Sequence, residues 1–180
     1  MRDFDELKLA RVIDACDGID GRVKMQKIVY LLKVMGYDLP FDDFVIRQHG
    51  PFSRSVAWAT DVLTGAEILI EKKEELSLVN EAEPVVQYSY RVRDEIAPLI
   101  RENFDIAAPG GKPKLDEIAS RLKKNGRAVL EVAATRVFLE REGLFGKKLD
   151  DELHRLKGHL SGDFDKADEL LGELRKESLL

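Results

Sequence analysis

Apolar residues recur at helical spacing in the first third of the chain. The first stripe predicts a helix over residues 3–16 and is formed by Leu9, Val12, Ile13 and Cys16. Similar spacing predicts helices over residues 22–35 and 54–64, with Ser53 as the N-cap of the third helix. Phe44, Ile46 and Gln48 alternate with Val45 and Arg47, which predicts a short extended piece closed by Gly50-Pro51.

The hydrophobic period then changes from 3.6 to 2. Residues 68–78 and 86–92 are predicted strands, joined by a turn at residues 80–84. Tyr88 and Tyr90 lie on one face of the second strand and are predicted to be in the core. A helix is expected over residues 95–104. Helix, helix, short strand, helix and hairpin is the order of elements in a winged helix.

The remainder of the chain has helical spacing throughout. Residues 109–113 combine two prolines with two glycines and predict a hinge or loop. Four helices are predicted after it, over residues 114–124, 127–142, 148–157 and 163–177. The second of these is apolar on most of its circumference, so we expect it to be buried on several sides.

The expected fold class is therefore α+β and predominantly helical. It comprises a winged-helix-like block over residues 1–108 and a C-terminal helical extension over residues 114–180 packed on that block. The amphipathic helix over residues 163–177 packs either on its own chain or on a second subunit, so a homodimer stays open.

The composition of the chain limits the classes of protein to which it can belong. The chain has 180 residues, of which 44% are hydrophobic, and contains one cysteine. We expect no membrane span, because the sequence has no apolar run of about 18 residues. The acidic start has no signal-peptide pattern, which favours a cytoplasmic location. Cys16 lies on an apolar stripe and is expected to be a small buried hydrophobe.

The overall charge does not favour nucleic acid as a partner. The sequence has 29 basic and 34 acidic residues, a net charge of −5. Positive charge is local, within residues 21–54, where three acids accompany six basic residues: Arg22, Lys24, Lys27, Lys33, Arg47 and Arg54. This segment is either a solvated face, with Lys24, Lys27 and Lys33 exposed, or a patch for an acidic partner.

A DNA-reading role would fall to the helix over residues 54–64. Its outward residues are expected to be Arg54, Ser55, Trp58 and Asp61. The predicted hairpin has two lysines amid five glutamates, so this surface is poor in phosphate contacts. Trp58 is expected to be partly buried between this helix and the hairpin, or to anchor a partner.

No arrangement of residues predicts catalysis, a cofactor or a metal. His49 and Ser53 are four apart, but Pro51 intervenes and no group orients the imidazole, so we expect His49 to be a turn residue bonded to the backbone. His154 and His159 are five apart, which does not fit a helical metal pair. Helix-capping or turn chemistry explains the adjacent aspartates at positions 42 and 43.

Three stretches carry a family resemblance. They are Lys24-Met25-Gln26-Lys27-Ile28-Val29-Tyr30-Leu31-Leu32 followed by Gly36, His49-Gly50-Pro51-Phe52-Ser53, and Leu130-Glu131-Val132-Ala133-Ala134-Thr135. In this order they resemble the KLQKLxYLL…G, YGPYS or YGPFS, and LELAAT segments of YwgA-like proteins. The wider relatives share a domain with the SocA-type antitoxins, also called Panacea. The family commonly has an aromatic residue where this chain has His49.

The resemblance implies a winged-helix-like fold with a helical extension. It also implies that the chain binds another protein, since some relatives are antitoxins or adaptors, and it brings no catalytic residues. Within the first stretch, Gln26 and Tyr30 share a helix face. We expect the Tyr30 hydroxyl to find a partner in the His49-Gly50 turn, a contact with a structural or a functional role.

The sequence thus predicts a non-enzymatic regulatory or adaptor module that binds another protein, with antitoxin-like action as one form. The alternatives are a sequence-specific DNA-binding regulator of winged-helix type and an uncharacterised enzyme. No cofactor and no membrane contact are expected. The predicted partner-binding residues are Arg22, Lys24, Lys27, Arg47, Arg54 and Trp58.

Overall fold

The computed structural model describes residues 5–76 and 85–180, and within them the fold is α+β and predominantly helical, as predicted. The helices are α1 (Asp5–Ala15), α2 (Arg22–Val34), α3 (Arg54–Gly65), α4 (Ala97–Asn103), α5 (Leu115–Lys123), α6 (Arg127–Arg141), α7 (Gly146–Lys157), the 3₁₀ helix η1 (Gly158–Asp163) and α8 (Phe164–Lys176). The strands are β1 (Ile19–Asp20), β2 (Phe44–Arg47), β3 (Gly50–Ser53), β4 (Leu69–Leu76) and β5 (Val85–Val92). The predicted turn at residues 80–84 lies outside the described residues.

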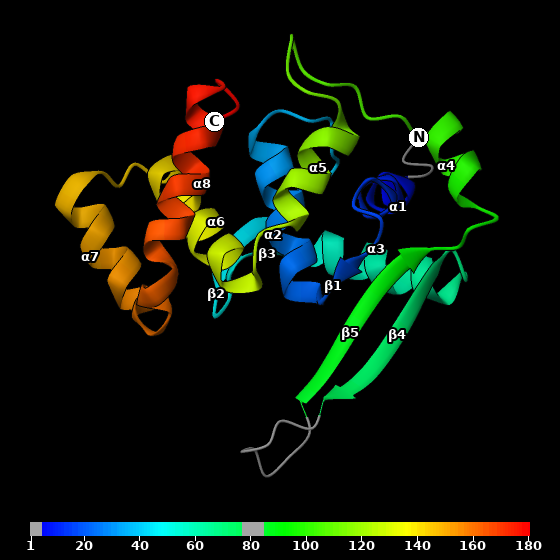
Figure 1. The fold of residues 1–180 in the computed structure, drawn as a ribbon, viewed down its shortest axis with the longest axis horizontal. Coiled ribbons are helices and arrows are strands. Elements are labelled where there is room, and N and C mark those ends of the chain that lie inside the picture. The colour runs from blue at the N-terminus through cyan, green and yellow to red at the C-terminus, as the bar shows by residue number, and fades with distance from the viewer. Residues whose placement is uncertain (1–4, 77–84) are drawn as a thin grey trace.

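Three strands form one antiparallel sheet in the order β1-β5-β4. The long strands β4 and β5 pair from Leu69 opposite Val92 to Leu76 opposite Val85, and Ile19 of β1 pairs with Tyr90. The β4–β5 hairpin extends away from the helical body (Figure 1). The hydrophobic pattern does not indicate β1, because two residues are too few to show alternation.

A second, two-stranded sheet is formed by the segment that connects α2 and α3 in the sequence, and it packs on α2 and α6. Strands β2 and β3 form a hairpin around the two-residue turn at residues 48–49. The expectation that Gly50-Pro51 closes an extended piece is wrong, because both residues belong to β3. Gly50 has a φ of +83°, a left-handed conformation that lets the chain re-enter a strand directly after the turn.

The position of Gly50 is also restricted by space. A Cβ atom at this residue would lie 2.5 Å from the Thr135 hydroxyl oxygen and 3.5 Å from the Glu131 carbonyl oxygen of α6. The hairpin backbone therefore lies directly on α6, and only glycine satisfies both the dihedral angle and the space.

Helix α6 is the centre of the helical part. It contacts α2 and β3 on one side and α7 and α8 on the other, so the predicted burial on several sides is confirmed. The inward side chains of α8 pack within the same chain, and they are Ala167, Leu170, Leu171 and Leu174. Residues of both predicted blocks enter one hydrophobic core, and the division into blocks at residues 109–113 stays a prediction.

The structure also tests the predictions for Ser53, for Cys16 and for membrane-spanning helices. The Ser53 hydroxyl accepts a hydrogen bond from the Val56 amide at 3.0 Å, so the predicted N-cap of α3 is confirmed. Cys16 is buried as expected, and burial raises the pKa of its thiol to about 12. No helix in the described part of the chain has the length and apolar character needed to cross a membrane.

Candidate functional site

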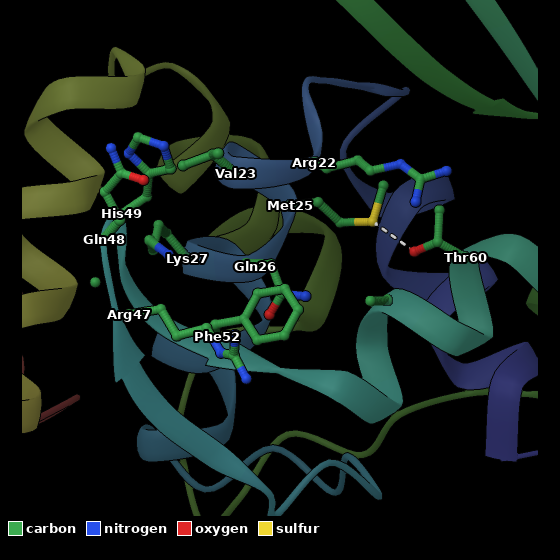
Figure 2. A pocket seen from close by; sticks show the side chains of 12 residues that line it. Arg22, Val23, Met25, Gln26, Lys27, Arg47, Gln48, His49, Phe52 and Thr60 are labelled. Atoms are coloured by element: carbon green, nitrogen blue, oxygen red, sulfur yellow. Dashed lines mark hydrogen bonds between the residues drawn. The ribbon is translucent and has the colours of Figure 1, made fainter.

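A pocket of about 610 Å³ lies between α2, the β2–β3 hairpin and α3. Figure 2 shows the side chains of these three elements around it. Its apolar walls are formed by Val23, Met25, Phe52 and Ala57. On the α3 side the Thr60 hydroxyl lies 3.3 Å from the Met25 sulfur. A volume of several hundred Å³ with mostly apolar walls is typical of ligand sites.

The polar lining of the pocket combines basic residues with the neutral side chains of Gln26, Gln48 and Thr60. Three of the six predicted partner-binding residues, Arg22, Lys27 and Arg47, line it together with His49. Among the described residues that line the pocket, none is acidic. In a chain with a net charge of −5, this absence of carboxylates makes the pocket electrostatically distinct from the rest of the molecule.

The two arginines have different environments. Arg22 lies 2.8 Å from an Asp61 carboxylate oxygen and 3.3 Å from Glu71, so two acids offset its charge. Arg22 also donates to the Tyr90 hydroxyl at 2.7 Å. The Arg47 guanidinium lies 5.1 Å from the centre of the Phe52 ring and forms no ion pair within residues 5–76 and 85–180. Arg47 thus keeps its charge available at the pocket.

Lys27 is not on the surface, so the expectation that it faces solvent is wrong. Only 1% of the residue is exposed, and its ammonium group donates to the Pro51 carbonyl at 2.6 Å. Helical spacing alone assigns a lysine to the solvent side, but this face of α2 is covered by the hairpin. Burial disfavours the charged amine and lowers the pKa of Lys27 to about 7.

A buried ion pair lies behind the hairpin. Lys157 of α7 is 2.6 Å from a carboxylate oxygen of Glu131, and the two residues are 1% and 2% exposed. Lys157 also donates to the Gln48 carbonyl at 2.6 Å. Two further groups face the same carboxylate, His49 at 3.6 Å and Arg127 at 3.9 Å. The buried pair thereby connects the C-terminal helices to the turn of the hairpin.

His49 contacts α6 side chains. Its Nδ1 lies 3.4 Å from an Arg127 nitrogen as well as 3.6 Å from Glu131. The expected bond from His49 to the backbone is replaced by these contacts, because the turn lies against α6.

Gln26 and Asp43 hold the other end of the hairpin. The Gln26 amide donates to the Ser53 carbonyl and accepts from the Ser53 amide, both at 2.9 Å. Asp43 accepts from the Ser53 hydroxyl and, at 3.0 Å, from the Ser55 amide. Ser53 is therefore fully engaged as a structural residue, and the predicted capping or turn role of the aspartates is confirmed at Asp43.

Tyr30 does not reach the turn as expected. Its ring packs on Phe44 and Phe138, with centroid distances of 5.1 and 6.0 Å, and burial raises the pKa of its hydroxyl. The contact between helix and hairpin predicted for Tyr30 is made instead by Gln26 and Lys27.

The other predicted partner-binding residues lie around the pocket. Lys24 is half-buried and lines a second cavity of about 530 Å³, which shares Arg22 and Val23 with the first. Arg54 and Trp58 are exposed on α3, and Trp58 is 59% exposed. The expectation that Trp58 is partly buried against the hairpin is wrong, because α3 packs on the protein through other positions.

The tyrosines of β5 differ in burial. Tyr90 is fully buried, as predicted for the core, whereas Tyr88 is 36% exposed. The predicted core position of Tyr88 is wrong, because Tyr88 lines the surface cavity beside Lys24 instead of entering the core.

The described residues contain no group of three or more side chains able to hold a metal ion. His154 instead packs on the Phe164 ring, with a centroid distance of 4.9 Å, and its Nδ1 lies 2.9 Å from the Asp150 carbonyl oxygen.

Comparison with known proteins gives one informative similarity. The chain is 23% identical over 175 residues to the uncharacterized protein YwgA of Bacillus subtilis (strain 168), covering 96% of this chain and 97% of that protein. No family model matches the chain, and no solved structure matches it. The similarity supports a YwgA-like relation over almost the whole length.

Proposed function

We propose that this protein is a non-enzymatic regulatory or adaptor module that binds another protein through the outer face of α3. The observation that carries the proposal is a stripe of exposed residues at four-residue spacing, Arg54, Trp58 and Val62. Trp58 is 59% exposed and Val62 is 37% exposed. Tryptophan and arginine are the residues most enriched among the energetic centres of protein interfaces. We call Arg54, Trp58 and Val62 the α3 stripe.

A winged-helix interpretation is supported by the order α1-β1-α2-β2-β3-α3-β4-β5, in which the β2–β3 hairpin stands between α2 and α3, and by the sheet order β1-β5-β4. In that interpretation α3 is the helix that would enter a DNA groove and the β4–β5 hairpin is the wing. The charges of this surface argue against DNA as the partner. Asp61 and Glu71 offset Arg22, and Lys73 pairs with Glu75 at 3.5 Å. Phosphate contacts need uncompensated cations, so a protein partner fits better.

Antitoxin-like action is the specific form of this proposal. It rests on the three sequence stretches that resemble the SocA-type antitoxins, whose action is to bind another protein. All three stretches meet in the structure, since Lys27 of the first donates to the Pro51 carbonyl of the second, and His49 of the second lies 3.6 Å from Glu131 of the third.

The test is affinity capture of the tagged protein from its own host, followed by reconstitution with the purified partner. We expect one protein in equal amount, lost when Trp58→Ala is combined with Arg54→Glu. Phe145→Ala is the matched control, because Phe145 is 69% exposed and lies at the start of α7.

Two outcomes contradict the proposal. The first is equal loss of the partner in the Phe145→Ala control, which would make the α3 stripe irrelevant. The second is salt-sensitive binding of random duplex DNA that disappears with Lys24→Glu and Arg54→Glu, which would identify a DNA-binding regulator.

A further inference from the structure

The pocket between α2, the β2–β3 hairpin and α3 has the size and walls of a small-molecule site. Its volume of about 610 Å³ falls inside the range of about 300–1,000 Å³ found for ligand pockets. Val23, Met25, Phe52 and Ala57 come from three different elements and give it apolar walls. An occupant must therefore have an apolar body.

The basic residues of the pocket favour a negatively charged ligand. Arg47 forms no ion pair with a described residue, and its guanidinium lies over the Phe52 ring in the pocket wall. Stacking on an aromatic ring holds the guanidinium in place, and its planar set of donors matches a carboxylate. A cationic or zwitterionic occupant would find no acid among the described lining residues.

Charged side chains behind the pocket wall also favour an anionic ligand. Lys27 lies at the inner wall with its ammonium on the Pro51 carbonyl. The nearby Glu131 carboxylate is already paired with Lys157 and faced by Arg127. Lys157 and Arg127 already offset the single Glu131 carboxylate, so this group leaves no net negative charge behind the pocket, and the partly protonated Lys27 adds positive charge at the inner wall.

We propose that this pocket binds a small amphipathic anion, a molecule with a compact apolar body and one carboxylate, with Arg47 as the group that holds the carboxylate. The site is separate from the α3 stripe, since Ala57 and Thr60 of α3 line the pocket and Arg54, Trp58 and Val62 do not. It goes beyond the adaptor proposal, and either can fail without the other.

The experiment is isothermal titration of the purified full chain, with the binding site located by amide chemical shifts. Two anionic probes with different bodies, decanoate and 1-naphthylacetate, distinguish an aliphatic from an aromatic ligand. Decyltrimethylammonium has an alkyl chain one carbon longer than that of decanoate and the opposite charge, and acetate has the carboxylate without the apolar body. All are used below the concentrations at which they form micelles.

We expect saturable one-to-one binding of at least one anionic probe and none of decyltrimethylammonium or acetate. Arg47→Met should weaken that binding about tenfold or more, because a charge-assisted hydrogen bond is lost. Ala57→Phe fills the pocket and should abolish it. Arg155→Met removes an exposed arginine of α7 and should change nothing, and Trp58→Ala should also leave binding intact.

Equal binding of the cationic and anionic ten-carbon probes would overturn the proposal. So would shift changes located outside α2, the hairpin and α3, or the absence of saturable binding by both anions at millimolar concentration. Arg47 is exposed at the surface, so Arg47→Met keeps the test decisive even if Ala57→Phe does not fold.

Discussion

Replacing Gly50 by alanine tests whether the β2–β3 hairpin lies directly on α6. The new Cβ would be 2.5 Å from the Thr135 hydroxyl oxygen, 3.5 Å from the Glu131 carbonyl oxygen and 3.5 Å from the Lys27 Cε. The residue would also have to keep a φ of +83°. The free energy of unfolding therefore falls for two separate reasons.

The two contributions have different magnitudes. An alanine at positive φ costs about 1 kcal/mol or a little more. Overpacking against a closely packed helix costs about 1–3 kcal/mol. We expect Gly50→Ala to destabilise the protein by about 2–4 kcal/mol, measured by urea unfolding followed by far-ultraviolet circular dichroism.

Gly111→Ala is the matched control. Gly111 has a φ of +78°, and a Cβ built there meets no heavy atom within 4 Å. This variant should lose only the backbone contribution of about 1 kcal/mol. Combining Gly50→Ala with Thr135→Ala should cost less than the sum of the two single changes, because the second removes the clashing oxygen. If Gly50→Ala costs no more than Gly111→Ala, the packing of the hairpin on α6 is wrong.

Three further predictions concern the groups around the hairpin. Between about pH 7 and pH 10 the unfolded chain binds more protons at Lys27 than the folded chain does. The stability of the wild type should therefore rise with pH relative to Lys27→Met, by at most about 1.4 kcal/mol per pH unit, with no relative change below pH 7. Parallel pH profiles of the two proteins in urea unfolding would show that Lys27 has an ordinary pKa. Lys157→Met leaves the Glu131 carboxylate without its closest partner and should cost about 3–5 kcal/mol, much of it recovered by adding Glu131→Leu; a loss below about 1 kcal/mol in chemical denaturation would contradict the buried pair. Ser53→Ala removes the N-cap of α3 and should cost about 1 kcal/mol in thermal or urea unfolding, whereas Ser55→Ala, which removes only an exposed hydroxyl beside Asp43, should cost less.

The helical framework could be predicted because its residues follow simple periodicity. Helix α6 illustrates this, since its apolar circumference required burial on several sides, and the structure places it between α2, β3, α7 and α8. The Ser53 cap followed from residue type and position alone. The strand β3 could not be predicted, because Gly50-Pro51 is a pair that usually occurs in turns. The packing of Gly50 on α6 depends on residues about 80 positions further along the chain.

The polar centre of the molecule was harder to predict than its core. Lys27 and Lys157 are charged residues on amphipathic helices, and spacing assigns such residues to solvent unless the buried partner is known. Glu131 offered a usable signal, since an acid within an otherwise apolar stretch of α6 needs a buried cation. The pocket could not be found from sequence, because it forms only where α2, the hairpin and α3 meet.

The claim that α3 presents the docking surface is tested most directly by hydrogen–deuterium exchange on the reconstituted complex. We expect the captured partner to slow amide exchange in residues 54–65 and to leave α7, including the segment next to Phe145, unchanged. Slower exchange in α7 with no change across residues 54–65 would contradict it.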